Sequence, residues 1–323
     1  MRWRLSTWVT AFLLLPLLGQ AAVPVPPSVA RQQLKINVPG QIRGSFYAYP
    51  KDNPRLTLQR ILGRGPRARD VVQGELNDCF FVGTLGAIAH AQPQHIEQLF
   101  VTDGRGHIQL DEQGRASVRL YRKGKRETVK VSAALVYGPN GKARFTQPAK
   151  GKLWAPLLEM AYATMLSNHA RRKGLTTINQ GGAPEDVIYA LTGQRAGYRD
   201  LAANRAGVDE TWRLLKETTE RGSIVVAGTV SGKREMKIRL GELLETGVLG
   251  GWARRMTLGG QRMISDHDQS VLGVVERDGQ RLVKIRNPWG SFVPRGSGRH
   301  SGEYELPIEK FMVFFDGVTY SRG

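Results

Sequence analysis

The sequence predicts an α+β fold, with helices concentrated in the first half of the chain and antiparallel strands in the second. Apolar residues recur with a helical period from Cys79 to Ala89 and again from Lys152 to Leu166. In the second half, two strand-like runs at 269–276 and 281–286 flank Asp278-Gly279, a dipeptide typical of β-hairpin turns. A chain of 323 residues is long enough to stabilise such a fold by its core alone.

The amino terminus has the layout of a secretory signal peptide. A short basic region precedes an apolar run from Trp8 to Leu18, and the small residues Gly19 and Ala21 favour cleavage after Ala21. The run is shorter than the roughly 20 residues that a spanning helix needs, so an uncleaved anchor is the weaker alternative. We therefore expect 1–21 to be a signal peptide and the protein to be secreted or periplasmic.

Residues 22–69 contain many Gly, Pro and Arg residues and little sustained periodicity. We expect an extended leader, which either wraps the first part of the fold or acts as a propeptide. After the first helix, alternating runs at 107–110, 116–121 and 128–131 predict a small antiparallel sheet. After the second helix, Pro184 at a helix start and Gly193 just past its end agree with ordinary capping.

The second half is predicted to begin with a helix at 208–220 and an apolar strand at 223–228. Residues 230–260 are basic, Gly-rich and weakly patterned. We interpret this stretch as a loop that covers the cleft between the two halves of the fold.

The hairpin brings two polar residues to the same end of the sheet. His267 lies just before its first strand and Asn287 just after its second. A two-residue turn at Asp278-Gly279 would place the two side chains on opposite faces, because strand parity is strict. We predict a three-residue loop at 278–280, or a bulge near Asp268 that has the same effect, so that both side chains share one face.

Cys79 is the only cysteine in the chain and stands at the first turn of a predicted helix. A helix N-terminus stabilises a thiolate and lowers the cysteine pKa below its free value of roughly 8.5. The alternative is a small buried hydrophobic residue, as most free cysteines are. In an exported protein a leftover cysteine favours a reactive thiol. Such a thiolate needs a histidine as its proton partner and an amide to orient the imidazole, which makes His267 and Asn287 candidate partners.

The formal net charge is +19, from 47 Lys and Arg against 28 Asp and Glu. Such a charge favours association with anionic partners, which for an exported protein are lipid headgroups, cell-wall polymers or acidic proteins. The basic residues are dispersed rather than interleaved with aromatic residues, so nucleic acid is not expected as a partner.

Several segments resemble calpain-type cysteine peptidases of the papain-like superfamily. The loop before Cys79 matches the family's Gln-Gly and Asp-Cys positions, although Asn77 replaces a glycine and Phe80 a tryptophan. The segment 267–274 is similar to the family's histidine motif, and its Arg-Asn-Pro-Trp-Gly is unchanged at 286–290. Further similar segments are the helix at 152–163, the Gly-Gly pair at 181–182, Leu-Thr-Gly at 191–193 and the closing segment at 302–318.

The resemblance implies a papain-like fold of two subdomains with the active site in the cleft between them. The first, 70–197, would be helical around the central Cys79 helix, and the second, 198–323, rich in antiparallel strands. We take Gly193 to about Leu201 as the hinge. Together with the signal peptide, the resemblance is to a secreted bacterial form of the family.

The resemblance also implies a thiol protease, a hydrolase that cuts peptide bonds in protein or peptide substrates. The implied roles are Cys79 as nucleophile, His267 as general base and acid, Asn287 as its orienter, Gln73 as oxyanion donor and Trp289 as the indole that shields the pair from water.

Calpain cores are calcium-gated, and this chain departs from their ligand pattern. Asp70, Gly63 and Gly65 match three positions of the first site, but Thr177 stands where a glutamate is expected. The loop at 291–300, where the family has an acidic loop, contains no carboxylate, although calcium prefers six to eight oxygen ligands that include carboxylates. We expect a calcium-independent core without a bound cofactor.

His267 is flanked by Asp266 and Asp268, where calpains have Gly and Ala. Two carboxylates favour the imidazolium form, which predicts a thiolate–imidazolium pair that persists to higher pH than an isolated histidine would allow.

Two other functions are compatible with the same sequence motifs. A transglutaminase-like enzyme would transfer the acyl group to an amine with the same Cys-His pair, and a non-catalytic basic protein would only bind an anionic partner. Asn287 argues for hydrolysis over transfer, and the combined presence of Gln73, Cys79, His267 and Trp289 argues against the binding protein. The substrate and the cleavage preference do not follow from the sequence.

Overall fold

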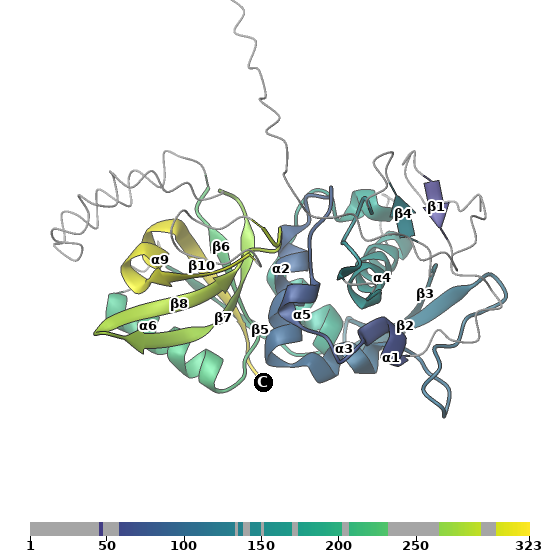
Figure 1. Ribbon diagram of the computed structural model, residues 1–323, viewed down its shortest axis with the longest axis horizontal. Helices are drawn as coiled ribbons and strands as arrows, with labels where there is room; N and C mark the ends of the chain where they lie inside the picture. The colour runs from purple at the N-terminus through teal and green to yellow at the C-terminus, as the bar shows by residue number, and fades with distance from the viewer. Residues whose placement is uncertain are drawn as a thin grey trace, which may run out of the picture.

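The computed structural model describes residues 45–47, 58–132, 135–137, 143–149, 152–169, 174–201, 207–231, 265–291 and 302–323. The predicted signal peptide, most of the 22–69 leader and nearly all of the predicted 230–260 loop lie outside the described residues. Within the described residues the fold combines helices with antiparallel sheets, as predicted (Figure 1).

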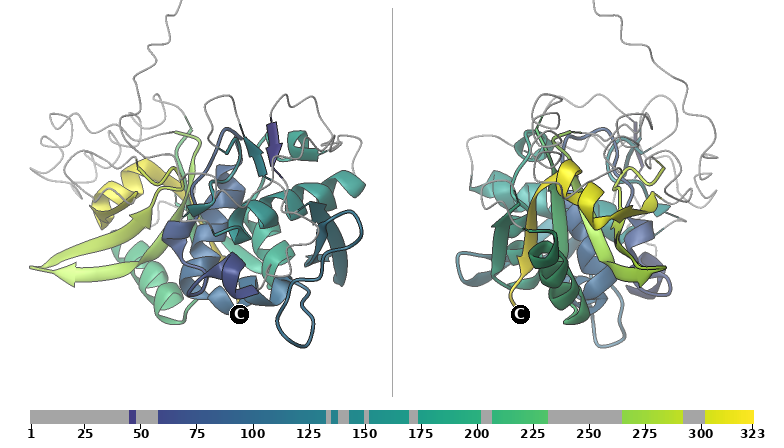
Figure 2. Two further views of the ribbon diagram at one scale, coloured as in Figure 1. Left: turned by 45° about the vertical axis from the view of Figure 1, so that its right-hand side comes forward. Right: turned by 90° about the vertical axis from the view of Figure 1, so that its left-hand side faces the viewer.

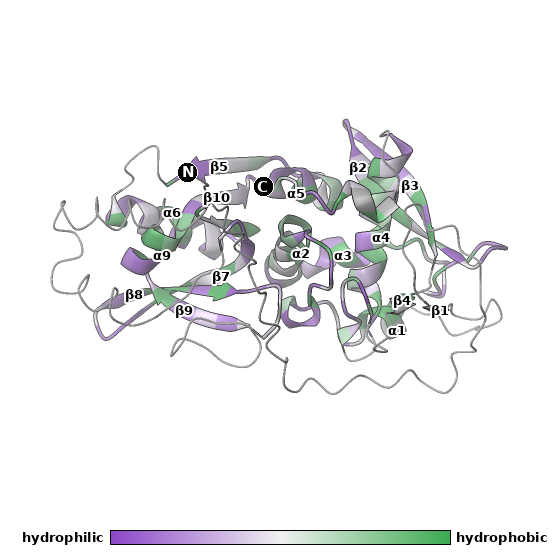
Figure 3. Ribbon diagram, turned by 90° about the horizontal axis from the view of Figure 1, so that it is seen from above, coloured by the Kyte–Doolittle hydropathy of each residue, from purple (hydrophilic) through white to green (hydrophobic). Residues whose placement is uncertain are grey.

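Helix α2 (Cys79–Ala91) is the central element of the helical part. Every side chain or glycine from Cys79 to Ala89 is buried, because the helix is apolar on all sides and so has no face for solvent. It lies between the largest sheet and α4 (Trp154–Asn168) in two views (Figures 1 and 3). The other elements of this part are α1 (Leu58–Leu62), η1 (Ala68–Asp70), α3 (Pro93–Leu99), η3 (Gly174–Thr177) and α5 (Pro184–Thr192).

The largest sheet has six strands in the order β5-β10-β6-β7-β8-β9, and all its neighbouring strands are antiparallel. Helices α6 (Val208–Glu220) and α9 (Ile308–Phe314) lie beside it, and the turn of the β7–β8 hairpin projects from the body (Figure 2). The strands are β5 (Ala196–Asp200), β6 (Val225–Thr229), β7 (Asp268–Arg277), β8 (Gln280–Arg286), β9 (Glu303–Pro307) and β10 (Phe315–Ser321).

Strand β6 contributes to two hydrophobic clusters. Ile224 and Val226 belong to the cluster around α2 and α4, whereas Val225 and Ala227 belong to the cluster beneath α6 and α9. This division follows from the alternation of side chains along a strand. The sheet therefore packs against α2 on one face and against its own helices on the other.

The segment that we interpreted as a hinge is more regular than expected. Gly193 ends α5 with a φ of 76°, which glycine adopts without strain. The chain then enters β5, which pairs with β10 at the edge of the sheet. The predicted helix at 208–220 matches α6, and the closing segment forms β9, α9 and β10.

The small predicted sheet contains two strands rather than three. β2 (Arg115–Arg122) and β3 (Lys125–Ser132) form a hairpin through Lys123 and Gly124, both of which have positive φ. The predicted first run, 107–110, makes only single bridges through Ile108 and Leu110. Two further short strands, β1 (Ser45–Tyr47) and β4 (Leu135–Tyr137), pair with each other.

The predicted three-residue loop of the β7–β8 hairpin is wrong, but the shared face is reached by a bulge. The turn has two residues, Asp278 and Gly279, because Arg277 pairs with Gln280. The register then shifts between Val271 and Gly273, so that Ser270 pairs with Arg286. One extra residue reverses the parity of everything before it. The bulge therefore lies further along the strand than Asp268, with the predicted effect.

Candidate active site

Cys79 is the first residue of α2, as the sequence predicts, and its side chain is buried. The carbonyl oxygen of Asp78 accepts the N–H groups of Phe81 and Val82 at 2.8 and 3.0 Å, which begins the helix directly at the cysteine. Sγ contacts the carbonyl oxygen of Asp266 at 3.9 Å. The thiol therefore faces the segment that leads into β7.

Glycines on α2 allow β7 to approach the helix closely. A Cβ at Gly83 would lie 2.8 Å from the carbonyl oxygen of Asp268, and one at Gly86 would lie 2.6 Å from Oγ of Ser270. Oγ of Ser270 also donates a hydrogen bond to the carbonyl oxygen of Gly83 at 2.6 Å. These contacts fix the cysteine helix against the strand that follows His267.

His267 is buried, and both its backbone and its ring are held. Its N–H donates to Oγ1 of Thr229 at 2.9 Å, and its carbonyl oxygen accepts the N–H of Thr229 at 3.1 Å. In the ring, Nε2 lies 2.9 Å from Oδ1 of Asn287. That oxygen also accepts the N–H of Trp289 at 2.9 Å, so the amide presents an acceptor to the imidazole.

This pairing determines the tautomer of the neutral imidazole. Because Oδ1 of Asn287 is an acceptor, Nε2 must carry the proton, which leaves Nδ1 as the nitrogen able to accept one. Trp289 lies against His267, with ring centroids 5.0 Å apart, and remains 42% exposed. Its indole thus covers the imidazole on one side while its outer face meets solvent.

The residues on both sides of His267 contact the thiol through their backbone. Sγ of Cys79 contacts the carbonyl of Asp266 and is hydrogen-bonded by the backbone of Asp268. Asp266 has a φ of 53°, a left-handed conformation that aspartate tolerates better than most residues. A glycine would adopt it without strain.

The pKa shifts of Cys79 and His267 are opposite in direction to those of the predicted ion pair. Burial, together with the charges of Asp268 and Asp78, raises the pKa of the Cys79 thiol to about 11. Burial also lowers the pKa of His267, and only the hydrogen bond to Asn287 opposes it. Burial raises the pKa of the Asp268 carboxyl to about 7. At neutral pH this carboxyl is therefore only partly ionised, whereas the prediction assumed a full negative charge. For each group taken by itself, burial therefore favours the neutral form, the neutral thiol of Cys79 and the neutral imidazole of His267.

Gln73 lies in the loop before Cys79, with its amide directed within that loop. Nε2 donates to the carbonyl oxygen of Leu76 at 2.8 Å and to Oδ1 of Asp78 at 3.2 Å. These two bonds use both amide hydrogens. The backbone N–H of Gln73 donates to the carbonyl oxygen of Pro288, which attaches the loop to the segment after Asn287.

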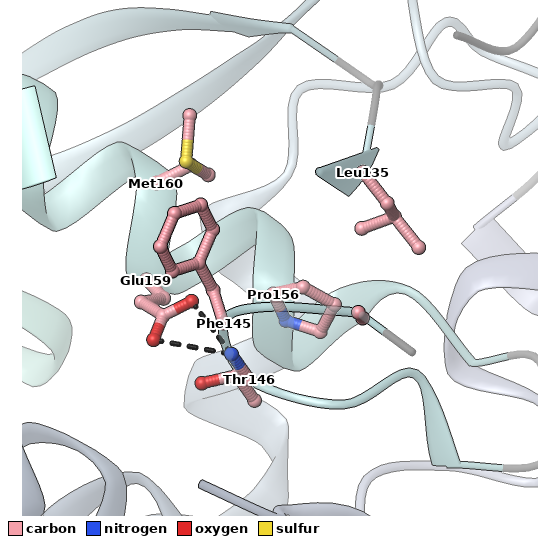
Figure 4. Close-up of a pocket in the computed structure, with 7 residues that line it drawn as sticks. Leu135, Phe145, Thr146, Pro156, Glu159 and Met160 are labelled. Carbon is pink, nitrogen blue, oxygen red and sulfur yellow. Dashed lines mark hydrogen bonds between the residues drawn. The ribbon is translucent and has the colours of Figure 1, made fainter. Parts of the chain in front are cut away.

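A buried carboxyl pair includes Asp78, the residue before Cys79, and the sequence did not predict this pair. Asp78 and Glu159 share a hydrogen bond and are both inaccessible to solvent. Burial raises the pKa of Asp78 to about 6 and, with the charge of Asp78, raises that of Glu159 well above its usual range. Glu159 also accepts the N–H of Thr146 through both oxygens, beside a small pocket of about 10 Å³ (Figure 4).

Two features, a metal-binding cluster and a membrane-spanning helix, are absent from the described residues. The part of the chain that the structure describes contains no group of three or more His, Cys, Asp or Glu side chains arranged to hold a metal ion. None of the described helices is long and apolar enough to cross a membrane.

Comparison with known proteins places these observations in a family. Residues 51–304 match the family model described as calpain family cysteine protease. The chain is 28% identical over 229 residues to the calpain-type cysteine protease DEK1 of Arabidopsis thaliana, covering 69% of this chain and 9% of that protein.

Two further relatives have similar identities. The calpain-like protease palB/RIM13 of Aspergillus oryzae is 24% identical over 250 residues, covering 75% of this chain and 26% of the relative. Calpain-13 of Rattus norvegicus is 24% identical over 234 residues, with coverages of 70% and 30%. The chain thus spans less than a third of each relative.

These relatives come from a plant, a fungus and a mammal, so they do not support the predicted bacterial source. The family model, by contrast, covers most of the chain, including Gln73, Cys79, His267, Asn287 and Trp289. The chain therefore belongs to the calpain family of cysteine proteases, a family of cysteine endopeptidases and thus of hydrolases.

Proposed function

We propose that this chain is a cysteine endopeptidase that hydrolyses peptide bonds of protein substrates. The observation that carries the proposal is the pair of His267 and Asn287, joined at 2.9 Å, beside a backbone segment that contacts the thiol of Cys79. Nucleophile, base and orienter are the three groups that thiol hydrolysis needs.

The reaction begins from the neutral pair. As Sγ of Cys79 attacks the carbonyl carbon of the substrate, Nδ1 of His267 takes the thiol proton. The tetrahedral intermediate then collapses when the imidazolium gives this proton to the amine that leaves, and a thioester remains on Cys79. Water attacks the thioester with His267 again as base, which releases the acid and restores the thiol.

The negative oxygen of the intermediate needs hydrogen-bond donors. The first N–H groups of a helix have no partner within it, so the N–H of Cys79 at the start of α2 is one donor that the fold can supply. Gln73 is the predicted second donor. It can act when Nε2 gives up its longer bond, the one of 3.2 Å to Asp78.

The residues that match the family's first calcium site do not fit the metal. Oδ2 of Asp70 lies 2.6 Å from the Lys152 ammonium and accepts the N–H of Arg67 at 3.0 Å. The same ammonium contacts the carbonyl oxygen of Gly65 at 3.2 Å. A divalent cation at these oxygens would lie beside a positive charge, and the hydroxyl of Thr177 instead contacts Ser167. We therefore propose a calcium-independent enzyme.

We place substrate binding where the two hydrophobic clusters meet, and we retain 70–197 and 198–323 as the two subdomains. The signal-like amino terminus supports export to the periplasm or the extracellular space. The formal charge of +19 supports an additional anionic surface or acidic protein as partner.

Product analysis separates hydrolysis from acyl transfer. An unfolded protein is incubated with the chain and a small primary amine, beside a Cys79→Ala variant, and the products are identified by mass spectrometry. The proposal expects new carboxyl and amino termini that depend on Cys79. Products that carry the amine would instead establish a transferase.

A further inference from the structure

Lys152 places a cation in a largely enclosed position just before α4. Nζ donates to Oδ2 of Asp70 at 2.6 Å and to the carbonyl oxygen of Gly65 at 3.2 Å. The side chains of Lys152 and Asp70 are 15% and 6% exposed. Because water screens such a pair only weakly, its loss affects the fold more than the loss of a surface pair does.

The loop around Lys152 is shaped to accept that side chain. Gly63 has a φ of 64°, and a Cβ at this position would lie 2.8 Å from Cε of Lys152. The next residue, Leu153, donates its N–H to the carbonyl oxygen of Ile61 at 3.2 Å. Two successive residues thus attach the start of α4 to the end of α1 and to the loop that follows it.

Asp70 begins a short segment, 70–73. This segment is also held by the two residues that flank Asn287. Val71 accepts a hydrogen bond from Nη2 of Arg286 at 2.6 Å, and Gln73 donates its N–H to Pro288 at 2.9 Å. Arg286 and Pro288 flank Asn287 in the sequence. Six residues after Gln73 the same chain reaches Cys79.

We propose that Lys152 is a positioning residue whose ammonium group acts as a permanent internal cation and holds segment 70–73 between α4 and Asn287. This inference rests on the proposed function for its catalytic consequence. Lys152 touches neither Cys79 nor His267, so it acts through Asp70. This role also explains why calcium does not fit here. The ammonium group of Lys152 already binds oxygens that the metal would need.

Three variants of the full chain test the role of this charge. Lys152→Met removes the charge while keeping a stem of similar length, and Lys152→Arg keeps the charge. The matched control is Lys216→Met, which removes an exposed lysine of α6 that lies 3.9 Å from Glu220. Hydrogen exchange of the amides at 68–73, measured by mass spectrometry, reports the order of the segment without requiring activity. Peptidase kinetics report the consequence for the site.

We expect Lys152→Met to speed exchange at 68–73 by about tenfold or more and to leave exchange in β7 and β8 unchanged. The value of kcat should fall on the order of 100-fold, with a smaller change in KM, because displaced catalytic groups lose alignment. Lys152→Arg should restore part of both values, and Lys216→Met should match the wild type.

Wild-type exchange at 68–73 in Lys152→Met would overturn the proposal, as would equal exchange rates and equal kcat values in Lys152→Met and Lys152→Arg. If Lys152→Met fails to fold, Asp70→Asn removes the paired carboxylate charge instead and should show the same exchange increase; its absence there would also overturn the proposal. If the wild type cleaves nothing, the exchange data still decide the role of Lys152, so failure of the proposed function is separately visible.

Discussion

Oδ1 of Asn287 lies 2.9 Å from Nε2 of His267 and holds the imidazole in one tautomer. Replacement by alanine removes this acceptor and leaves the backbone hydrogen bond of residue 287 to Gly302 intact. We expect Asn287→Ala to lower kcat by about 100-fold with little change in KM, since proton transfer and not substrate contact is impaired. Steady-state kinetics with a quenched peptide check this; an unchanged kcat with a raised KM would contradict the assigned role.

The pH dependence of kcat/KM distinguishes the neutral pair from the ion pair that the flanking carboxylates predict. Burial lowers the pKa of His267 and raises that of Cys79 to about 11. The neutral imidazole is the active form, so activity should rise with pH through a midpoint below about 6.5 and then stay level to about pH 9. A fall in activity between about pH 7 and 9 would show that an imidazolium is required and that the ion pair is the resting state.

Gly83 tests the close approach of α2 to β7. A Cβ there would lie 2.8 Å from the carbonyl oxygen of Asp268, which is backbone and cannot rotate away. Gly83→Ala should therefore destabilise the fold by about 1–3 kcal/mol, although alanine is the better helix former. Gly104→Ala is the matched control, because nothing lies within 4 Å of its Cβ position. Denaturant unfolding measures both; equal stability of the two variants would refute the close contact.

The carboxyl pair of Asp78 and Glu159 makes stability depend on pH. The folded-state pKa of Asp78 is raised to about 6 by burial, and that of Glu159 is raised further, so the native state binds more protons than the unfolded chain. This stabilisation is complete below the unfolded pKa values of about 4 and is lost as pH rises through the folded ones.

Thermal unfolding midpoints should therefore fall between about pH 4 and pH 7 for the wild type. Glu159→Gln provides a donor to Asp78 that does not titrate, so it should flatten this fall and stabilise the fold at neutral pH. A Glu159→Gln variant with the same pH slope as the wild type would show that the pair does not share a proton.

Local pattern predicted the elements of the site well. Cys79 begins α2 because a polar loop changes there to an apolar run, and His267 and Asn287 meet because a hairpin joins their strands. The two side chains lie on the same face of the sheet only if one extra residue shifts the strand register. The bulge after Val271 provides this shift, whereas we had expected a three-residue loop to provide it. Glycine at position 273, with a φ of 142°, is the signal in the sequence that could have located it.

Long-range contacts were not predictable from pattern. Asp78 stands just before α2 and Glu159 lies within α4, and nothing local shows that they meet in the core. Lys152 appeared as a residue at a helix start, whereas its ammonium reaches Asp70, 82 residues earlier in the chain. The raised pKa of Cys79 was not predicted either, because flanking charges are visible in a sequence and the degree of burial is not.

The most direct test of the account is cleavage of an unfolded protein by the chain from Ala22 onward, in excess calcium chelator and beside Cys79→Ala. We predict cleavage by the chain, none by the variant, and no increase when calcium is added, since Lys152 already pairs with Asp70. Cleavage that appears only with added calcium would contradict the proposal that the enzyme is independent of calcium. The absence of cleavage under both conditions would contradict the proposed peptidase activity.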